Sequence, residues 1–498
     1  MHAVPALTES QRDAAVKAAA GLATSWINGD FSRDTKDEKR AVVSPYSGAT
    51  LVEIAMGAAR HVDKAVAAAR AALKGPWGTG GHQYRADLIR KLADAVDAHR
   101  LEFALLETLD VGKPIQHSYN DDAPTTVAVL RWYASLVETA YDRAPTRRSG
   151  VQIQVVREPQ GVVGIILPWN YPLTTLALKL GPALAAGNTV VCKPADDTPL
   201  STIRLAQLAS EIGFPPGVIN VVPGTGAVAG KAIGLHDDVA AINFTGSTAT
   251  GRKFLQYSAE SNLKEISLEC GGKNPAILLE DADYGRIADD LSTGFLMNSG
   301  QLCSSISRIL APRGHEAKLR SILADKMAAW PVGDPLDPST RIGPLVSDAH
   351  AAKVKSAIDA ERGRNNDLLV SAAPTNGASP RLVAPIAFFN VDEKSPAWRD
   401  EIFGPVLSVN FYDTVDDAIV RANDTAYGLS AYVFGSDPQA ISKASEQLDA
   451  GFVAVNAFCE GDFTTPFGGF KTSGFGGKDK GIHSLDQYSR TKSVWWAI

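Results

Sequence analysis

Three residues of the chain have side chains and neighbours that could support catalysis. Cys303 lies in the segment Gly-Gln-Leu-Cys-Ser-Ser, a small and polar neighbourhood that can expose a thiol and lower its pKa. Glu269 ends an apolar run and is followed, after Cys270, by two glycines, which predicts a carboxylate at a strand end, where ligands bind. Asn170 lies between an apolar run and an expected helix, where its amide could donate to an oxyanion.

Each of these residues also has a plainer interpretation. A lone cysteine is more often an inert core residue, and a lone glutamate is more often solvated at the surface. Asparagine is also favoured as a helix N-cap. None of the three identifies a reaction by itself.

The central part of the chain alternates apolar runs with amphipathic stretches. Such runs are typical of strands that are buried on both faces of a parallel sheet. Strands are expected at 162–167, 189–192, 218–222 and 240–244, and helices at 172–186, 199–212, 227–235 and 247–260. The alternation predicts an α/β fold with a doubly wound parallel sheet, whose ligand-binding loops lie at one edge.

Other elements flank this unit. Before it we expect a hairpin at 26–29, a strand pair at 42–55, helices at 62–73, 84–100, 101–109 and 121–141, and an exposed strand at 151–158. After it we expect a second α/β set, with strands at 276–279, 307–311, 406–411 and 431–434 and a surface loop at 363–380. The apolar end of the chain, with Val494, Trp495 and Trp496, is expected to pair with another subunit. Docking on its own chain is the alternative.

The composition excludes several classes of protein. The 498 residues suggest about three domains. The net charge of −6, without a basic stripe, argues against a nucleic-acid partner. None of the four cysteines forms a CxxC pair, so a reducing cytoplasm fits best and no metal is expected in the chemistry. The most apolar stretch, 161–191, contains prolines, asparagines and a lysine, so we expect no membrane span.

Motifs along the whole chain resemble those of the aldehyde dehydrogenase superfamily in order and spacing. They lie at 44–48, 168–172, 193–194, 244–248, 268–275, 300–303, 401–405 and 466–474. The resemblance implies a Rossmann-like cofactor domain (1–136 and 160–270), an α/β catalytic domain (271–471) and a small β oligomerisation arm (137–159 and 480–498). It also implies a homodimer or a homotetramer.

The resemblance assigns catalytic roles by position. Cys303 would be the nucleophile that attacks the aldehyde carbon, and the Asn170 amide and the Cys303 backbone N–H would hold the oxyanion. Glu269 would be the general base that activates water for hydrolysis of the thioester. Relatives that transfer the acyl group to coenzyme A usually lack this glutamate, so its presence favours hydrolysis.

The cofactor implied by the resemblance is NAD, with NADP possible. Its pyrophosphate would lie near Thr245, Gly246 and Ser247, where a helix begins and favours an anion. The remaining cofactor residues would be Trp169, Lys193 and Asp196, and Glu401 with its neighbour Phe403.

Two departures from the family pattern matter. Asp196 replaces the glutamate that NAD-preferring members usually carry; it would still repel a 2′-phosphate, but it is shorter by one methylene and leaves room for NADP. Some relatives have a second glutamate behind the catalytic cysteine, and the segment 476–480 offers no clear counterpart.

The chain resembles in particular the bacterial γ-glutamyl-γ-aminobutyraldehyde and ω-aminoaldehyde dehydrogenases of polyamine breakdown. The shared segments are 105–114, 121–122, 131–134 and 460–464. An acidic tunnel mouth would attract a protonated amine, and aromatic side chains would form the wall. The acids are Asp121, Asp122, Glu460 and Asp462, and the aromatic residues are Tyr171, Phe458 and Phe467. The same acids could instead be solvated, or could cap helices, as Asp122 could.

Other functions remain open at this point. A semialdehyde or a general aliphatic or aromatic aldehyde is the alternative substrate, although an acidic aldehyde would call for an arginine, and only Arg131 is a candidate. A thiol hydrolase or esterase would need none of the cofactor residues. A non-catalytic binding protein would often have lost Cys303 or Glu269, and both are present.

Overall fold

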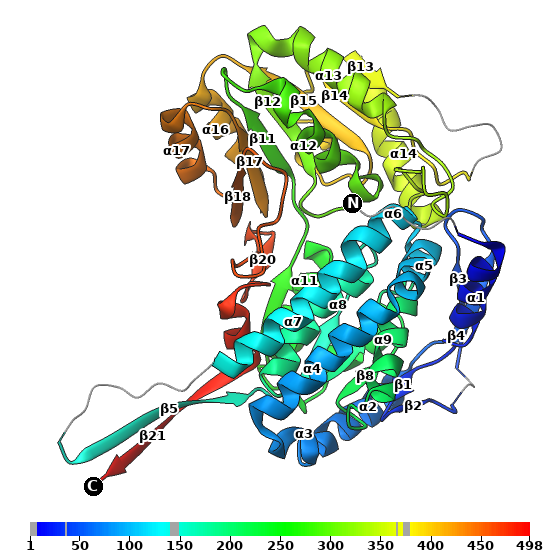
Figure 1. Cartoon of the computed structure of the whole chain (residues 1–498). Coiled ribbons are helices and arrows are strands. Elements are labelled where there is room, and N and C mark those ends of the chain that lie inside the picture. The colour runs from blue at the N-terminus through cyan, green and yellow to red at the C-terminus, as the bar shows by residue number, and fades with distance from the viewer. Residues whose placement is uncertain (1–6, 35–36, 140–148, 365–366, 372–378) are drawn as a thin grey trace.

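A computed structural model describes residues 7–34, 37–139, 149–364, 367–371 and 379–498. Figure 1 shows two lobes, each built around its own sheet, and a two-stranded arm that extends away from the lower lobe. Within these described ranges, no helix is both long and apolar enough to cross a membrane.

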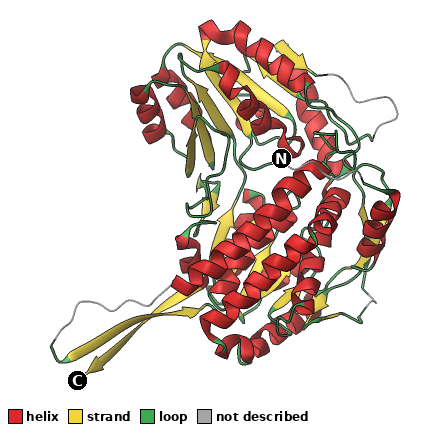
Figure 2. Cartoon of the chain, viewed as in Figure 1, coloured by secondary structure: helices red, strands yellow, loops and turns green. Residues whose placement is uncertain are grey.

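The lower lobe contains an eight-stranded sheet with the order β2-β1-β8-β7-β6-β9-β10-β20. Its five central strands are parallel: β6 (Val162–Ile166), β7 (Thr189–Lys193), β8 (Ile219–Val221), β9 (Val239–Thr245) and β10 (Glu265–Glu269). The connecting helices are α8 (Pro172–Ala185), α9 (Leu200–Glu211), η2 with α10 (Gly226–Gly230, Lys231–Leu235) and α11 (Thr248–Glu260). The predicted α/β alternation is confirmed, and helices lie over this sheet (Figure 2).

The N-terminal part of the chain completes this lobe. Its elements are α1 (Glu9–Ala20), β1 (Trp26–Ile27), β2 (Asp30–Phe31), β3 (Lys39–Val43), β4 (Thr50–Ala55), α2 (Ala59–Ala72), α3 (Pro76–Thr79), α4 (Gly81–Ala98), α5 (Arg100–Val111), α6 (Ile115–His117), η1 (Ser118–Asp122) and α7 (Ala123–Thr139). Asn28 and Gly29 have φ angles of 57° and 80°, as the predicted turn between β1 and β2 requires. Because η1 leads directly into α7, Asp122 is not a helix N-cap, and that alternative is wrong.

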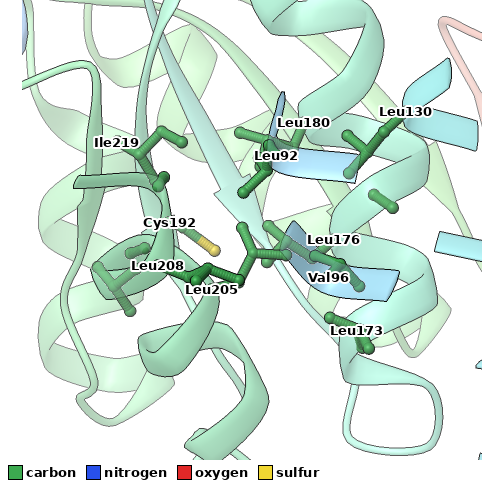
Figure 3. Packing of buried hydrophobic residues seen from close by; sticks show 14 of the residues in the cluster. Leu92, Val96, Leu130, Leu173, Leu176, Leu180, Cys192, Leu205, Leu208 and Ile219 are labelled. Carbon is green, nitrogen blue, oxygen red and sulfur yellow. The ribbon is translucent and has the colours of Figure 1, made fainter. Parts of the chain in front are cut away.

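Leucines dominate the core of the lower lobe. Figure 3 shows side chains from four helices and two strands that pack in one cluster with Cys192: Leu92, Val96, Leu130, Leu173, Leu176, Leu180, Leu205, Leu208 and Ile219. Burial of each such side chain contributes about 1.5–3 kcal/mol, which holds α8 and α9 against the sheet. Burial also raises the pKa of the Cys192 thiol, so this cysteine is an inert core residue.

The upper lobe contains a seven-stranded sheet with the order β13-β14-β15-β12-β11-β17-β18. Its strands are β11 (Asn274–Leu278), β12 (Ile306–Pro312), β13 (Asp367–Val370), β14 (Ile386–Phe389), β15 (Val406–Tyr412), β17 (Ser430–Phe434) and β18 (Phe452–Val455). Its helical segments are α12 (Tyr284–Leu296), η3 (Met297–Gly300), η4 (Arg313–His315), α13 (Glu316–Ala328), α14 (Asp348–Arg362), α15 (Pro396–Arg399), α16 (Val415–Asn423) and α17 (Pro438–Gln447). The prediction of a loop at 363–380 is wrong where β13 pairs antiparallel with β14, because Leu368–Val370 is a short apolar run.

Short strands join the lobes, and the arm ends the chain. The short strands are β16 (Tyr427–Gly428), β19 (Phe470–Lys471) and β20 (Gly474–Phe475). They are followed by η5 (Ile482–Tyr488). In the arm, β21 (Ser489–Ala497) pairs antiparallel with β5 (Val151–Pro159) of the same chain. The backbone therefore docks on its own chain, while Trp495 and Trp496 remain about half exposed.

Candidate active site

Cys303 follows a sharp reversal of the chain at the end of α12. Asn298, Ser299 and Gly300 have consecutive positive φ angles of 49°, 59° and 73°. A Cβ at Gly300 would lie 2.1 Å from the backbone oxygen of Gly404, so only glycine fits there. The reversal brings Cys303 to the amino end of β12, at the junction of the two lobes.

Hydrogen bonds from neighbouring strands hold the backbone around Cys303. The Asn274 side-chain amide donates to the carbonyl of Cys303 at 2.8 Å and to that of Ser305 at 2.9 Å. The Tyr432 hydroxyl donates to the carbonyl of Ser304 at 2.7 Å. Because these donors belong to β11 and β17, the cysteine loop is held by the sheet of the upper lobe.

Asn170 is joined to the same loop. Its Nδ2 donates to the carbonyl of Gln301 at 3.0 Å, and its own carbonyl accepts from Asn298 at 3.1 Å. Asn170 is buried, and the N-cap of α8 is Tyr171, so the interpretation of Asn170 as a helix cap is wrong. A side-chain amide has two N–H donors, so one remains to meet an oxyanion beside Cys303.

Glu269 ends β10, as expected, and is buried. Burial raises its pKa well above the ordinary value; the charge of Asp479 raises it further, and Lys179 and Lys478 oppose the rise. Its Oε2 has no hydrogen-bond partner among the described residues. A carboxyl with a raised pKa and an open oxygen is suited to accept a proton from water.

Asp479 is the acid that sequence reasoning could not place. Its carboxylate bonds Lys179 Nζ at 3.1 Å, its backbone N–H donates to Glu269, and both partners of the ion pair are buried. Lys179 lies within an otherwise apolar helix, and a buried lysine requires an acidic partner. That lysine was the available signal, but its partner lies 300 residues further along the chain.

The electrostatics of Cys303 contradict one expectation. Burial raises the pKa of its thiol well above the ordinary value, and the charges of Glu460, Glu401 and Glu269 raise it further. The predicted lowering of the pKa is therefore wrong. Burial of the thiol, and then the nearby carboxylates, outweigh its small, polar neighbours in the sequence.

Glu401 is another buried carboxylate whose charge acts on Cys303. Its Oε1 accepts from the Gly272 backbone N–H at 2.9 Å, and a Cβ at Gly271 would lie 2.1 Å from its Oε2. Gly271 therefore leaves room for this carboxylate, and burial raises the pKa of Glu401 to about 7. Nearby, the Trp169 ring meets the Phe403 ring edge-on at 5.2 Å.

A helix begins at the turn expected to bind the pyrophosphate, as predicted. Thr245 ends β9, and Ser247 caps α11 by accepting from the Thr250 N–H at 3.3 Å. The Thr245 hydroxyl is buried and has no hydrogen-bond partner in the described part of the chain. A capped 13-residue helix beside an unsatisfied hydroxyl fits the pyrophosphate of a dinucleotide.

Lys193 ends β7, and Asp196 lies in the loop that follows it. Lys193 Nζ donates to Asp196 Oδ1 at 2.8 Å and to the carbonyl of Pro194 at 2.6 Å. Lys193 is buried, whereas 22% of the Asp196 side chain is exposed. The pair therefore offers a cation and a carboxylate that a ribose could meet.

Two of the acids predicted at the tunnel mouth have other environments. Asp122 is fully buried and accepts from Lys113 Nζ at 2.6 Å, so its prediction as a substrate-binding acid is wrong. Lys113 Nζ also lies 3.6 Å from the centroid of the Tyr171 ring. Asp462 is exposed and accepts from the Thr464 backbone N–H within its own turn.

The other two acids remain near Tyr171. Burial raises the Tyr171 pKa, and the charges of Asp122, Asp121 and Glu460 raise it further. Asp121 is partly buried, and burial raises its pKa to about 6. Glu460 accepts from the Ser304 hydroxyl at 2.5 Å and lies 3.3 Å from Lys480 Nζ, which places a partly neutralised carboxylate next to the cysteine loop.

Two of the aromatic residues predicted for the tunnel wall, Phe458 and Phe467, pack against other aromatic rings. The Phe458 ring lies 5.4 Å from that of Tyr432, the residue that bonds the cysteine loop. Phe467 is buried against Phe452 at 6.0 Å, with Lys480 Nζ 4.9 Å from its ring centroid. Phe458 is therefore linked to the cysteine loop through Tyr432.

Asp122→Asn is expected to destabilise the fold by about 3 kcal/mol, because it leaves the buried Lys113 ammonium without its nearest counter-charge. Urea unfolding followed by fluorescence measures the loss. Asp94→Asn is the matched control, since Asp94 pairs with Arg131 at the surface and its loss should change little. An unchanged unfolding midpoint for Asp122→Asn would contradict the structural role of the pair.

Comparison with known proteins identifies the family. The model of the aldehyde dehydrogenase family matches residues 31–494. The chain is 44% identical to an aminoacetaldehyde dehydrogenase of Pseudomonas aeruginosa and 41% identical to the NADP/NAD-dependent aldehyde dehydrogenase PuuC of Escherichia coli, covering 95% of every chain compared. The solved structure of a gamma-glutamyl-gamma-aminobutyraldehyde dehydrogenase from Burkholderia cenocepacia matches with a TM-score of 0.93 at 39% identity, over 98% of this chain and 99% of that one. The chain therefore belongs to the aldehyde dehydrogenase family.

Proposed function

We propose that this aldehyde dehydrogenase oxidises an aldehyde to a carboxylic acid, with NAD or NADP as the hydride acceptor, through a thioester on Cys303. The observation that carries the proposal is the convergence of Cys303, Asn170 and Glu269, which come from three distant parts of the chain, at the junction of the two lobes. A thiol, an amide donor and a carboxylate are the groups that this chemistry requires.

Acylation begins at Cys303. Its sulfur attacks the aldehyde carbon, and the carbonyl oxygen becomes an oxyanion that the Asn170 amide and the Cys303 backbone N–H stabilise. Each donor is worth about 3–4 kcal/mol in the transition state. Because burial and the nearby carboxylates raise the pKa of the thiol, its proton must leave before or during attack. Glu269 is the buried carboxylate with an open oxygen that can take it.

Deacylation uses Glu269 again. The carboxylate takes a proton from water, the hydroxide adds to the thioester carbonyl, and the Cys303 thiolate leaves as the acid forms. Lys179 and Asp479 lie behind Glu269 and can exchange the proton it has gained. The oxyanion donors serve this second addition as they serve the first.

The cofactor residues follow from the same site. NAD(P), when bound, would accept the hydride that leaves the former aldehyde carbon as the oxyanion collapses to the thioester. Ser247 and the first turn of α11 would hold its pyrophosphate, Lys193 and Asp196 its adenosine ribose, and Glu401 its nicotinamide ribose. The remaining contacts would come from Thr245, Gly246, Trp169 and Phe403.

The proposed substrate is an aldehyde that carries an amino or a γ-glutamylamino group. The names of the relatives support this class, and so does the Glu460 carboxylate beside the cysteine loop. Asp121 adds a second acid near Tyr171. A semialdehyde or a neutral aldehyde is the alternative, but it would gain nothing from these two carboxylates.

An aldehyde panel tests the substrate class. We expect ω-aminoaldehydes to exceed neutral aldehydes of matched length by tenfold or more in kcat/KM, which corresponds to about 1.4 kcal/mol. Glu460→Gln should lower the kcat/KM ratio of ω-aminoaldehydes to neutral aldehydes about tenfold, because it removes the charge next to the cysteine loop. Asp462→Asn is the control and should leave the preference unchanged, since its carboxylate is used within its own turn.

Preference for succinic semialdehyde or for neutral aldehydes would refute the aminoaldehyde class and leave the aldehyde dehydrogenase assignment intact. The subunit arrangement is a separate proposal. The partly exposed Trp495 and Trp496 on the β5–β21 arm support a homodimer or homotetramer that uses the arm.

A further inference from the structure

Arg40 joins the proposed adenosine-ribose site from a distant part of the chain. It lies on β3, and its guanidinium contacts Asp196 Oδ2 at 3.2 Å and Asp197 Oδ1 at 2.5 Å. On the other side, Asp196 Oδ1 accepts from Lys193 Nζ. Both oxygens of Asp196 are therefore bound by cations.

This arrangement changes the charge that a cofactor would meet. A carboxylate at this position disfavours NADP by repelling its 2′-phosphate. Here the two acids, Asp196 and Asp197, are balanced by the two cations, Arg40 and Lys193, so the formal charge of the four groups is zero. The usual repulsion is largely cancelled before any cofactor arrives.

The arginine is also able to change partners. Its side chain is 42% exposed, and those of Asp196 and Asp197 are 22% and 36% exposed, so the ion pairs are solvated and weak. A guanidinium binds phosphate through two parallel hydrogen bonds, which makes phosphate at least as good a partner as two separate carboxylates. Lys193, which is buried, cannot move as freely.

We infer that Arg40 is a specificity-determining residue for the cofactor. In the presence of NADP it leaves the aspartates and binds the 2′-phosphate, so the protein accepts both NAD and NADP. The inference rests on the proposed function only in assigning the adenosine ribose to Lys193 and Asp196. A purely structural Arg40, which only ties the 194–197 loop to β3, would affect both cofactors alike.

Binding of cofactor fragments tests the inference without turnover. Calorimetry would compare ADP-ribose with its 2′-phosphate on the full-length protein. We expect the two affinities of the wild type to lie within about tenfold of each other. Arg40→Gln should shift the ratio at least tenfold against the 2′-phosphate, and Arg40→Lys should restore part of it. The 2′-phosphate affinity should also fall more steeply with salt than that of ADP-ribose.

Two further variants sharpen the test. Arg60→Gln is the matched control, because Arg60 also bridges two aspartates, Asp34 and Asp37, neither of which pairs with Arg40 or Lys193, and it should leave the ratio unchanged. Asp197→Asn releases Arg40 from one partner and should raise the affinity for the 2′-phosphate several-fold. This gain does not depend on whether Arg40→Gln folds.

The outcomes separate the two proposals. If ADP-ribose binds but its 2′-phosphate does not, the inference is overturned and the proposed function stands. If Arg40→Gln weakens both ligands equally and Asp197→Asn changes neither, Arg40 is only structural and the inference is again overturned. If neither ligand binds the wild type, the proposed cofactor site itself fails, and the inference fails with it.

Discussion

Cys303→Ala is expected to reduce NAD(P)H formation from any aldehyde by about 10⁴-fold or more. The reason is that no other described cysteine can take its place: Cys192 and Cys270 are buried, and Cys459 lies in the exposed loop beyond Phe458. Without the sulfur no thioester forms, and the oxyanion donors have no tetrahedral centre to stabilise. Absorbance of the reduced cofactor gives the rate directly.

Cys459→Ala is the matched control, because it removes an exposed thiol and should leave turnover unchanged. Binding of ADP-ribose to Cys303→Ala by calorimetry checks that the variant still folds. Near-normal NAD(P)H formation by Cys303→Ala would refute the covalent mechanism, whereas equal losses in both variants would point to damage to the shared loops.

Glu269→Gln is expected to leave one burst of NAD(P)H, slower than in the wild type because Glu269 also takes the thiol proton. A steady state slower than the wild-type one by about 10²–10⁴-fold follows it. The amide has the shape of the carboxylate but cannot accept the proton of the attacking water, so the acyl enzyme accumulates. A burst amplitude close to one per active site, measured by stopped flow, would identify deacylation as the slow step.

The wild type should show a matching pH dependence. Because burial raises the Glu269 pKa, its carboxylate form is lost as the pH falls through that raised value, so steady-state turnover should rise with pH. Glu269→Gln should lose this rise. Glu265→Gln, at the exposed start of the same strand, is the control for both effects. Full steady-state turnover by Glu269→Gln, or an unchanged pH profile, would remove Glu269 from the base role.

The sequence by itself determined the order of the elements and the identity of the catalytic candidates. Apolar runs of four to six residues with helices between them were enough to predict the parallel strands β6 to β9, because that pattern is local. The residues Cys303, Glu269 and Asn170 could be named because each stands in a motif whose neighbours are adjacent in the chain. Of the second sheet, β13, β14 and β18 were not predicted; β13 has only three apolar residues, set in a polar stretch.

The tertiary structure alone decided the electrostatics of the site. The pairs Lys113–Asp122, Lys179–Asp479 and Arg40–Asp196 join residues 9, 300 and 156 positions apart, and no spacing rule connects them. In the fold, Asp122 is buried against Lys113, and Asp479 lies beside Glu269. The pKa of Cys303 is raised, although its local segment had predicted a low value. The physical reason is that burial and through-space charge set a pKa and an ion pair, and both depend on which distant segments the fold brings together.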